Sequence, residues 1–429
     1  MNRNLRKEIA GCLRVAGSVD AHLSALRKFS RRDWETSLEW LHLSGIALTF
    51  WDRLQNLGAE DVVPASVGAS LAAVFAEHRL RVAAMAQEFD SLNRQFESAG
   101  IAYAVWKGFA LIPEFYPDAC LRPSYDYDYL VSPETHPLAQ QVLIAAGYVR
   151  KRDDDATHHL TFALPAHASN SWNMPGSLYA ATFPRKVELH QRLWFDEAFN
   201  IPLQVPERIL DRKVRRTWQG VSFYSLGQED ALLFQALHAF QHILHNWCRL
   251  GWLWEIAHFL EHRSRDTSFW TRFYIHLKGN KQLSEIVSMV FMLAAALFHA
   301  PLPTPTNERV RDAMRGQVSL WVDQYGLSSA LDNFSENKYT LFLYREFVRD
   351  KATWRKIQRG RLLPLRRPNR VAGARNSTIS NLLPTIWKQG WYVMQRLAHH
   401  SVSGAAYLWE SARWQRLRRL RANRVLSSS

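Results

Sequence analysis

Residues 125–131 read Tyr-Asp-Tyr-Asp-Tyr-Leu-Val, and this alternation is typical of an extended strand. Successive side chains of a strand point to opposite faces, so the three tyrosines share one face and Asp126 and Asp128 share the other. The two carboxylates then lie a few ångströms apart. The tract therefore predicts a sheet, and it predicts that one strand of that sheet presents two acids side by side.

The sequence around this strand predicts an α+β fold. Further β-compatible runs stand at residues 101–106, 160–164 and 186–194, and a long helix is expected from about Ser66 to Ser98. We expect a small mixed sheet flanked by helices on both sides in sequence. The predicted parts are an N-terminal helical segment (1–98), the sheet domain (99–225), a helical domain (226–350) and a basic, aromatic-containing C-terminal extension (351–429).

Cysteine usage and hydropathy indicate the cellular compartment in which the protein is expected. Cys12, Cys120 and Cys248 are scattered singly, which argues against a disulfide framework and favours a reducing environment. The apolar stretch at the N-terminus is too short and too broken for a secretory signal. The most apolar run, residues 286–300, falls short of membrane-spanning length, so a buried helix is expected there. A cytoplasmic location is the resulting prediction.

Nearly all of the net charge of +15 belongs to the C-terminal extension. From Lys351 to the end the chain has 17 Lys or Arg residues and one acid, Glu410, so the first 350 residues are close to neutral. Two weakly amphipathic helices are expected in this extension, at about 382–399 and 404–424. Such a segment suits an anionic membrane surface, which would place the protein peripherally at the inner membrane, or a nucleic acid. A solvated tail, or a helix packed against an acidic partner, is the simpler alternative.

The paired acids predict a divalent-metal site. Two carboxylates on one strand face repel each other, and Mg²⁺, which prefers hard oxygen ligands, removes the conflict. Glu188 stands in another expected strand and could supply a third carboxylate, with His190 on the same face as a supporting donor. Such a site suits nucleotidyl transfer, because bound metal holds the triphosphate and stabilises the developing charge. Solvated strand faces are the alternative for each acid.

Residues before the acids suggest phosphate contacts. Lys107 and Gly108 follow an apolar strand, and a Gly at a strand-to-helix turn lets backbone N–H groups approach a phosphate at the N-terminus of the short helix expected over residues 109–115. Arg122 and Ser124 lie just ahead of the acids and are further phosphate-binding candidates. An ordinary turn and loop explain each residue equally well.

Histidines form a second group of candidates. His238, His242 and His245 recur at i, i+4 and i+7 of an expected helix and therefore share a face. They could bind zinc, line the active-site cleft together with His190, or form hydrogen bonds between helices. The HExxH pattern of many zinc sites does not accompany them. His158 and His159 come just before a strand, where one of them could face the cleft, or both could lie in a surface loop.

Several short motifs follow one another along the chain in a fixed order. They are Lys107-Gly108, Leu111, Tyr116, Arg122, Asp126, Asp128, Leu130-Val131, Gly147-Tyr148 and Val187-Glu188-Leu189-His190. In this order they resemble the uncharacterised nucleotidyltransferase family of the polymerase-beta-like superfamily, over about residues 65–260. The resemblance implies that Asp126 and Asp128 are metal ligands and that Glu188 is the third acid. It also favours cleft or fold roles over zinc for the His-rich helix.

The sequence thus predicts an enzyme that moves a nucleoside monophosphate from an NTP, such as ATP, to a hydroxyl-bearing acceptor with Mg²⁺ or Mn²⁺ as cofactor. The acceptor could be a small molecule, a glycan, a protein or an RNA. The alternative is a non-catalytic module that binds nucleotide or a partner and retains the fold. Phe109 after Gly108 and the 18-residue interval to Asp126 depart from the superfamily pattern and keep that alternative open.

Overall fold

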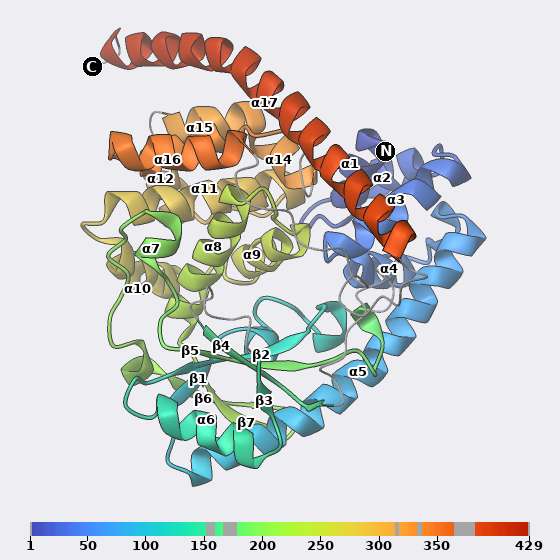
Figure 1. The fold of residues 1–429 in the computed structure, drawn as a ribbon, viewed down its shortest axis with the longest axis vertical. Helices are drawn as coiled ribbons and strands as arrows, with labels where there is room; N and C mark the ends of the chain where they lie inside the picture. The colour runs from blue at the N-terminus through green and yellow to red at the C-terminus, as the bar shows by residue number, and fades with distance from the viewer. Residues whose placement is uncertain are drawn as a thin grey trace. The chain divides into compact units, whose positions relative to one another are not determined.

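The computed structural model describes residues 2–151, 159–165, 178–313, 317–332, 337–363 and 382–427 (Figure 1). The chain forms two compact units. The first comprises Met1–Gln241 and Cys248–Met314, and the second comprises His242–Trp247 and Arg315–Ser429. The four-part division expected from the sequence stays a prediction.

The first unit begins with five helices: α1 (Arg3–Cys12), α2 (Asp20–Leu26), α3 (Arg31–Leu43), α4 (Ala47–Asn56) and α5 (Ala65–Ser98). The 34-residue α5 confirms the predicted long helix. It begins directly after Pro64, which has no N–H to satisfy, and it ends before Gly100, whose φ of +68° reverses the chain at little steric cost.

A seven-stranded mixed sheet follows, in the order β3-β4-β5-β2-β1-β7-β6. Its β2–β5 and β1–β7 pairs are parallel and the others are antiparallel. The predicted α+β class with a mixed sheet is therefore confirmed. The strands are β1 (Tyr103–Val105), β2 (Asp126–Val131), β3 (Val149–Arg150), β4 (His159–Ala163), β5 (Lys186–His190), β6 (Val214–Trp218) and β7 (Val221–Ser225).

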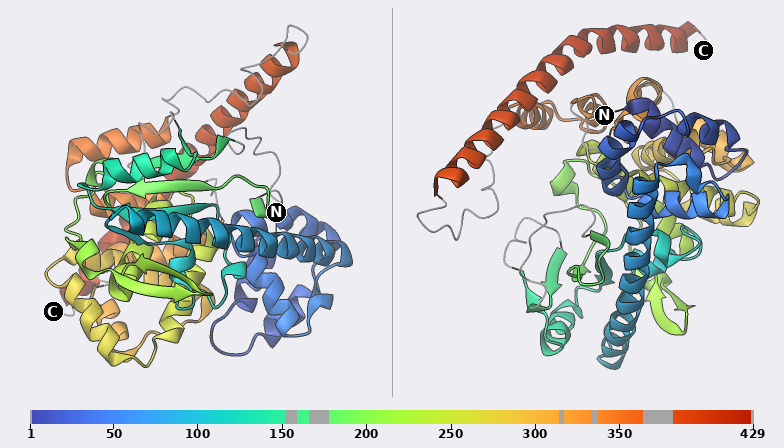
Figure 2. Two further views of the ribbon diagram at one scale, coloured as in Figure 1. Left: turned by 90° about the horizontal axis from the view of Figure 1, so that it is seen from below. Right: turned by 90° about the vertical axis from the view of Figure 1, so that its right-hand side faces the viewer.

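The alternation in β2 divides its side chains between two environments. Figure 2 shows α5 running along the sheet. The tyrosines of β2 form hydrogen bonds with this helix. The Tyr127 hydroxyl donates to the backbone oxygen of Met85 at 3.1 Å, and the Tyr129 hydroxyl donates to Asn93 Oδ1 at 3.0 Å. These bonds satisfy buried polar tips that would otherwise be costly. Asp126 and Asp128 consequently lie on the face of the sheet that α5 does not cover.

The β6–β7 hairpin has no counterpart in the sequence predictions. Gln219 and Gly220 both have positive φ, +45° and +83°, as a tight two-residue hairpin turn requires. The guanidinium of Arg216 in β6 donates to Glu114 Oε2 at 2.6 Å and to the backbone oxygen of Ala110 at 2.8 Å. The hairpin is thereby tied to the loop that follows β1.

Helices complete the first unit: α6 (His136–Ala145), α7 (Asp196–Phe199), α8 (Gln228–Leu244, whose last turn belongs to the second unit), α9 (Leu250–His262), α10 (Thr267–Leu277), α11 (Lys281–Phe298) and α12 (Thr304–Ala313). By length and composition α11 is the one described helix that could cross a membrane. Its apolar side chains are mostly buried in this unit, including Phe291 and Leu293, as the expected buried helix requires.

The second unit contains α13 (Gln317–Trp321), a π-helical turn (Val322–Gly326), α14 (Leu327–Leu331), α15 (Thr340–Phe347), α16 (Lys351–Leu362) and α17 (Leu382–Ser427). The prediction of two helices in the extension was wrong, because α17 is one continuous helix of 46 residues. Contacts on both sides of the expected break hold it together: His400 Nδ1 lies 3.0 Å from Lys338 Nζ, and Tyr407 stacks on Phe342 at 4.8 Å. These contacts outweigh the weak helix propensity of Gly404.

Candidate functional site

Three carboxylates from two neighbouring strands form the candidate site. Asp128 of β2 lies directly opposite Glu188 of β5, and Asp126 lies one pleat earlier on the same face. One oxygen of each carboxylate lies within 4.8 Å of the others. Asp128 is buried, whereas Asp126 and Glu188 are half-buried. The parallel register thus brings together the three acids that the sequence singled out.

Lys107 provides the nearest fixed positive charge. Its ammonium lies 3.1 Å from Asp128 Oδ1 and 3.9 Å from the centre of the Trp106 ring. The lysine can reach this point because β1, which ends just before it, pairs with β2. A cation held between a carboxylate and an aromatic face is favoured by both.

Two histidines lie against the acids from the side of β4 and β5. His190 Nε2 is 3.2 Å from Asp128 Oδ1 and 3.6 Å from Glu188 Oε2. His159 Nε2 is 3.3 Å from Glu188 Oε2, because the antiparallel β4–β5 register places His159 opposite His190. His190, expected to share the face of Glu188, does so. His158 lies outside the described residues.

The acids titrate differently because their surroundings differ. Burial, followed by the charges of Asp128 and Glu188, raises the pKa of Asp126 to about 7. Burial also opposes ionisation of Asp128, but Lys107 and a hydrogen bond from His190 outweigh it and lower that pKa. Hydrogen bonds from His159 and His190 likewise overcome burial and hold the pKa of Glu188 well below its usual range.

This donor set fits a divalent cation. Three carboxylate oxygens are the hard ligands that Mg²⁺ and Mn²⁺ prefer. Burial and the charges of Asp128 and Glu188 disfavour ionisation of Asp126, and a bound cation would offset both effects. The described residues therefore include an acidic cluster that could hold a metal ion.

The turn after β1 differs from the expectation. Gly108 adopts φ +60°, which explains why a glycine stands there. A four-residue 3₁₀ helix, Gly108–Leu111, replaces the helix expected as far as Phe115. The physical reason is Pro113, which disfavours helical backbone at the residue before it. Gly108 is therefore the first residue of a single short 3₁₀ turn.

Arg122 and Ser124 are held by interactions within the protein. Arg122 is buried, and its Nε donates to Glu255 Oε1 of α9 at 3.0 Å. A second nitrogen of the same guanidinium, Nη1, donates to Ser124 Oγ at 3.3 Å. His78 Nε2 lies 2.9 Å from the backbone oxygen of Arg122 and fixes the main chain there. The predicted phosphate contacts of Arg122 and Ser124 stay predictions.

The four candidate cleft histidines are not one group. His190 and His238 both meet the Trp106 ring edge-to-face, at 5.4 and 6.0 Å between ring centres. His242 and His245 belong to the second unit, where His245 lines a pocket. The three histidines of the expected helical face are therefore divided between the two units.

Sequence reasoning gave no site role to Glu255 or Trp106, and it left His159 undecided. The sequence could have indicated a buried ion pair at Glu255, because a single acid in the apolar run Leu250–Leu260 needs a buried partner. Nothing in the sequence singled out Trp106, since tryptophan is frequent throughout the chain. His159 depended on the β4–β5 register, which is not a local property.

The fold and the acid cluster define an α+β protein with a site competent to bind a metal ion. The model of the family described as "Uncharacterised nucleotidyltransferase" matches residues 30–299, more than half of the chain, and the chain belongs to this family. The resemblance is thereby confirmed, and the match extends beyond residues 65–260 at both ends. Membership supports a general role in nucleotidyl transfer, with an NTP as substrate. Neither the curated proteins nor the solved structures contain a match.

Proposed function

We propose that the protein transfers a nucleoside monophosphate from an NTP, such as ATP, to a hydroxyl-bearing acceptor. In this reaction the acceptor oxygen bonds to the α-phosphorus, and the bond between the α-phosphorus and the oxygen that bridges it to the β-phosphorus breaks. Pyrophosphate leaves, and the hydroxyl proton passes to water. The observation that carries the proposal is the convergence of Asp126, Asp128 and Glu188 within 4.8 Å on one sheet face. Family membership supports the reaction class.

The same three acids would hold Mg²⁺ or Mn²⁺, which would act as a Lewis acid at phosphate oxygens. From the sequence, Glu188 could be the third metal ligand or the base that activates the acceptor hydroxyl. Its lowered pKa favours the metal-ligand role, because a strongly acidic carboxyl is a poor proton acceptor at neutral pH. His190 and His159 keep Glu188 ionised and oriented.

Positively charged and small residues near β1 and β2 would receive the triphosphate. Lys107 already lies at the acids, so a metal ion at Asp128 would leave its ammonium for a phosphate oxygen. Gly108 has no side chain to hinder phosphate approach. Arg122 and Ser124 complete the proposed set. Since Arg122 is engaged by Glu255, we assign it mainly to holding Ser124 in place.

A cavity of about 950 Å³ supplies space for an acceptor. It borders the chain just after β2 and β5, with Leu130, Ser132 and Gln191 among its lining residues. Its volume lies in the range of small-molecule sites. Acidic and basic residues both line it, including Glu134 and Arg192, so the lining charge does not select among a small molecule, a glycan, a protein or an RNA.

Pyrophosphate release, measured with each of the four NTPs and mixed acceptors, tests the proposal. We expect release with Mg²⁺ or Mn²⁺ and its loss in EDTA, because the acids alone cannot neutralise the triphosphate. Binding of NTP without release from any acceptor mixture would support the alternative, a non-catalytic nucleotide- or partner-binding module.

We further propose that α17 rests on an anionic membrane surface, which would make the protein peripheral at the inner face of the cytoplasmic membrane. Its inner side packs through Tyr407 and Trp414 on the second unit. Its outer side exposes a row of apolar residues, with Trp387 75% and Trp409 85% exposed. Exposed basic residues accompany this row: Lys388, Arg413, Arg416 and Arg419. Aromatic and basic residues together suit a lipid interface.

Flotation of the full chain with vesicles tests this assignment. We expect binding to anionic but not to zwitterionic vesicles, and an affinity at least about tenfold lower for Trp391→Ser with Trp409→Ser, because each tryptophan would lose its buried apolar area. Ile275→Ser, which alters an exposed apolar residue of α10, is the matched control and should bind normally. Binding to nucleic acid but not to vesicles would assign α17 to the other partner class.

A further inference from the structure

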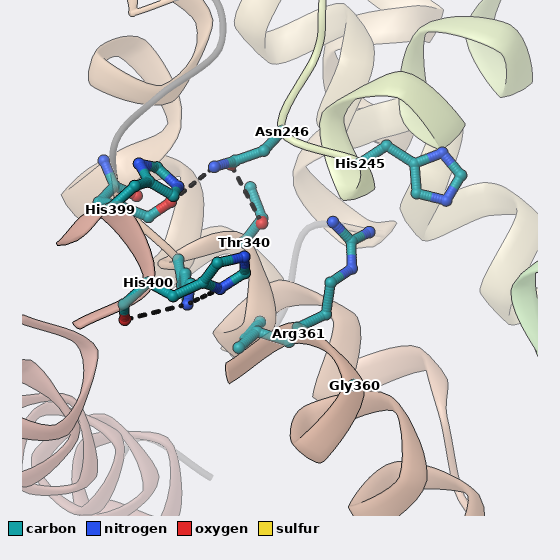
Figure 3. Close-up of a pocket in the computed structure, with 10 residues that line it drawn as sticks. His245, Asn246, Thr340, Gly360, Arg361, His399 and His400 are labelled. Atoms are coloured by element: carbon teal, nitrogen blue, oxygen red, sulfur yellow. Dashed lines mark hydrogen bonds between the residues drawn. The ribbon is translucent and has the colours of Figure 1, made fainter. Parts of the chain in front are cut away.

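A polar pocket of about 330 Å³ lies within the second unit (Figure 3). Its walls come from the loop after α8 and from α15, α16 and α17, which are far apart in sequence. The side chains that matter for its chemistry are Asn246, Lys338, Thr340, Arg361, His399 and His400. None of the residues that line it carries a carboxylate.

Lys338 places a cation in this pocket with little access to solvent. The residue is 8% exposed, and its ammonium lies 3.0 Å from His400 Nδ1 and 3.3 Å from the backbone oxygen of Leu362. Among the described residues no carboxylate pairs with it. A buried charge held only by neutral acceptors costs free energy that an opposite charge would recover.

Arg361 adds a second cation to the lining of this pocket. Its Nη2 donates to the backbone oxygen of Leu244 at 2.9 Å, and in the described part of the chain it has no acidic partner. The charge of Arg361 also lowers the pKa of Lys338, after the larger effect of burial. Two cations that disfavour one another therefore share a pocket without an anion.

The histidine beside Lys338 adds no negative charge. Because an ammonium can only donate, Nδ1 of His400 must accept, and its ring is then neutral with the proton on Nε2. Burial, followed by the charge of Lys338, lowers the pKa of His400, which keeps the ring neutral. The hydroxyl of Thr340 donates to Asn246 Oδ1 at 3.2 Å, so these polar groups are positioned against one another.

We propose that this pocket binds a phosphate-type oxyanion, either inorganic phosphate or the phosphate group of a small metabolite. An ammonium and a guanidinium that line the same pocket match a tetrahedral dianion, and a guanidinium can donate two parallel hydrogen bonds to it. The volume is at the lower end of small-molecule sites and admits a phosphate with a small attached group. The pocket is separate from the acid cluster, so this proposal does not depend on the proposed function.

Isothermal titration of the full chain with inorganic phosphate and with glycerol 3-phosphate, at constant ionic strength against chloride, tests the proposal. We expect saturable phosphate binding. Arg361→Gln and Lys338→Gln should each weaken it at least about tenfold, because each removes a charge-assisted donor. Tighter binding of inorganic phosphate would identify the free ion as the ligand, and tighter binding of glycerol 3-phosphate would identify a phosphorylated metabolite.

Two further measurements keep the result interpretable. Lys107→Gln removes the cation at the acid cluster and thereby distinguishes phosphate binding at the acids from phosphate binding in this pocket. Thermal stabilisation of the unaltered chain by phosphate over chloride covers the case in which a pocket variant fails to fold. The proposal is overturned if phosphate neither binds nor stabilises the chain, or if Lys107→Gln abolishes binding while the pocket variants retain it.

Discussion

Replacing Asp126 and Asp128 together by asparagine is expected to lower the rate of pyrophosphate release by about 10³-fold or more. Asparagine keeps the shape of each side chain but removes the negative charge that would hold the metal ion. Metal-ion catalysis contributes several kcal/mol to such reactions, and each 1.4 kcal/mol is a factor of about ten in rate. Initial rates under saturating NTP and Mg²⁺ measure the effect.

The fold should survive this double substitution. Removing the charge of Asp126 relieves repulsion from its neighbouring acids, whereas removing that of Asp128 leaves Lys107 without its buried partner, so the melting temperature should fall without loss of cooperative unfolding. Asp61→Asn, an exposed acid of the same unit paired with Arg27, is the matched control and should keep full activity. A folded double variant that retained wild-type activity would refute the assignment of these acids.

Arg122→Met is expected to destabilise the first unit by about 3–5 kcal/mol, since it leaves the buried carboxylate of Glu255 without its partner. Burial already raises the pKa of Glu255, an effect that the charge of Arg122 partly offsets. Urea denaturation followed by circular dichroism measures the loss.

Replacing both partners separates the ion pair from its surroundings. Arg122→Met combined with Glu255→Leu should recover most of the lost stability, because neither buried charge then remains unpaired. The exposed pair Arg31 and Glu35 of α3 is the comparison, since removing that arginine should cost no more than about 1 kcal/mol. Equal losses in the single and double variants would show that packing, and not the ion pair, holds this position.

Local patterns were enough to predict the elements that hold the acids. The two-residue period of β2 separated tyrosines from aspartates, and the helix-breaking residues Pro64 and Gly100 marked the two ends of α5. Glu188 could be placed on a strand face because Val187 and Leu189 mark the opposite face as apolar. Each of these features depends on residues close together in sequence.

The features that sequence reasoning missed depend on distant partners or on weak local patterns. Arg122 and Glu255 are 133 positions apart, and His159 reaches Glu188 only through the β4–β5 register. The strand β6 is largely exposed and lacks an apolar alternation, and its Gln-Gly turn is a less specific signal than Asn-Gly. Continuity of α17 depends on contacts with α15 that its own sequence does not reveal.

The parallel pairing of β2 with β5 also determines which changes in chain length the protein tolerates. Inserting one residue into β2 between Asp128 and Leu130 would shift the register and turn the acids toward α5. Between Ser132 and Arg185, length changes outside β4 make no such demand, because interstrand hydrogen bonds, and not connector length, set Asp128 opposite Glu188 and His159 beside it. Relatives with longer or shorter connections could therefore retain the same chemistry, whereas a one-residue shift of register in β2 or β5 would abolish it.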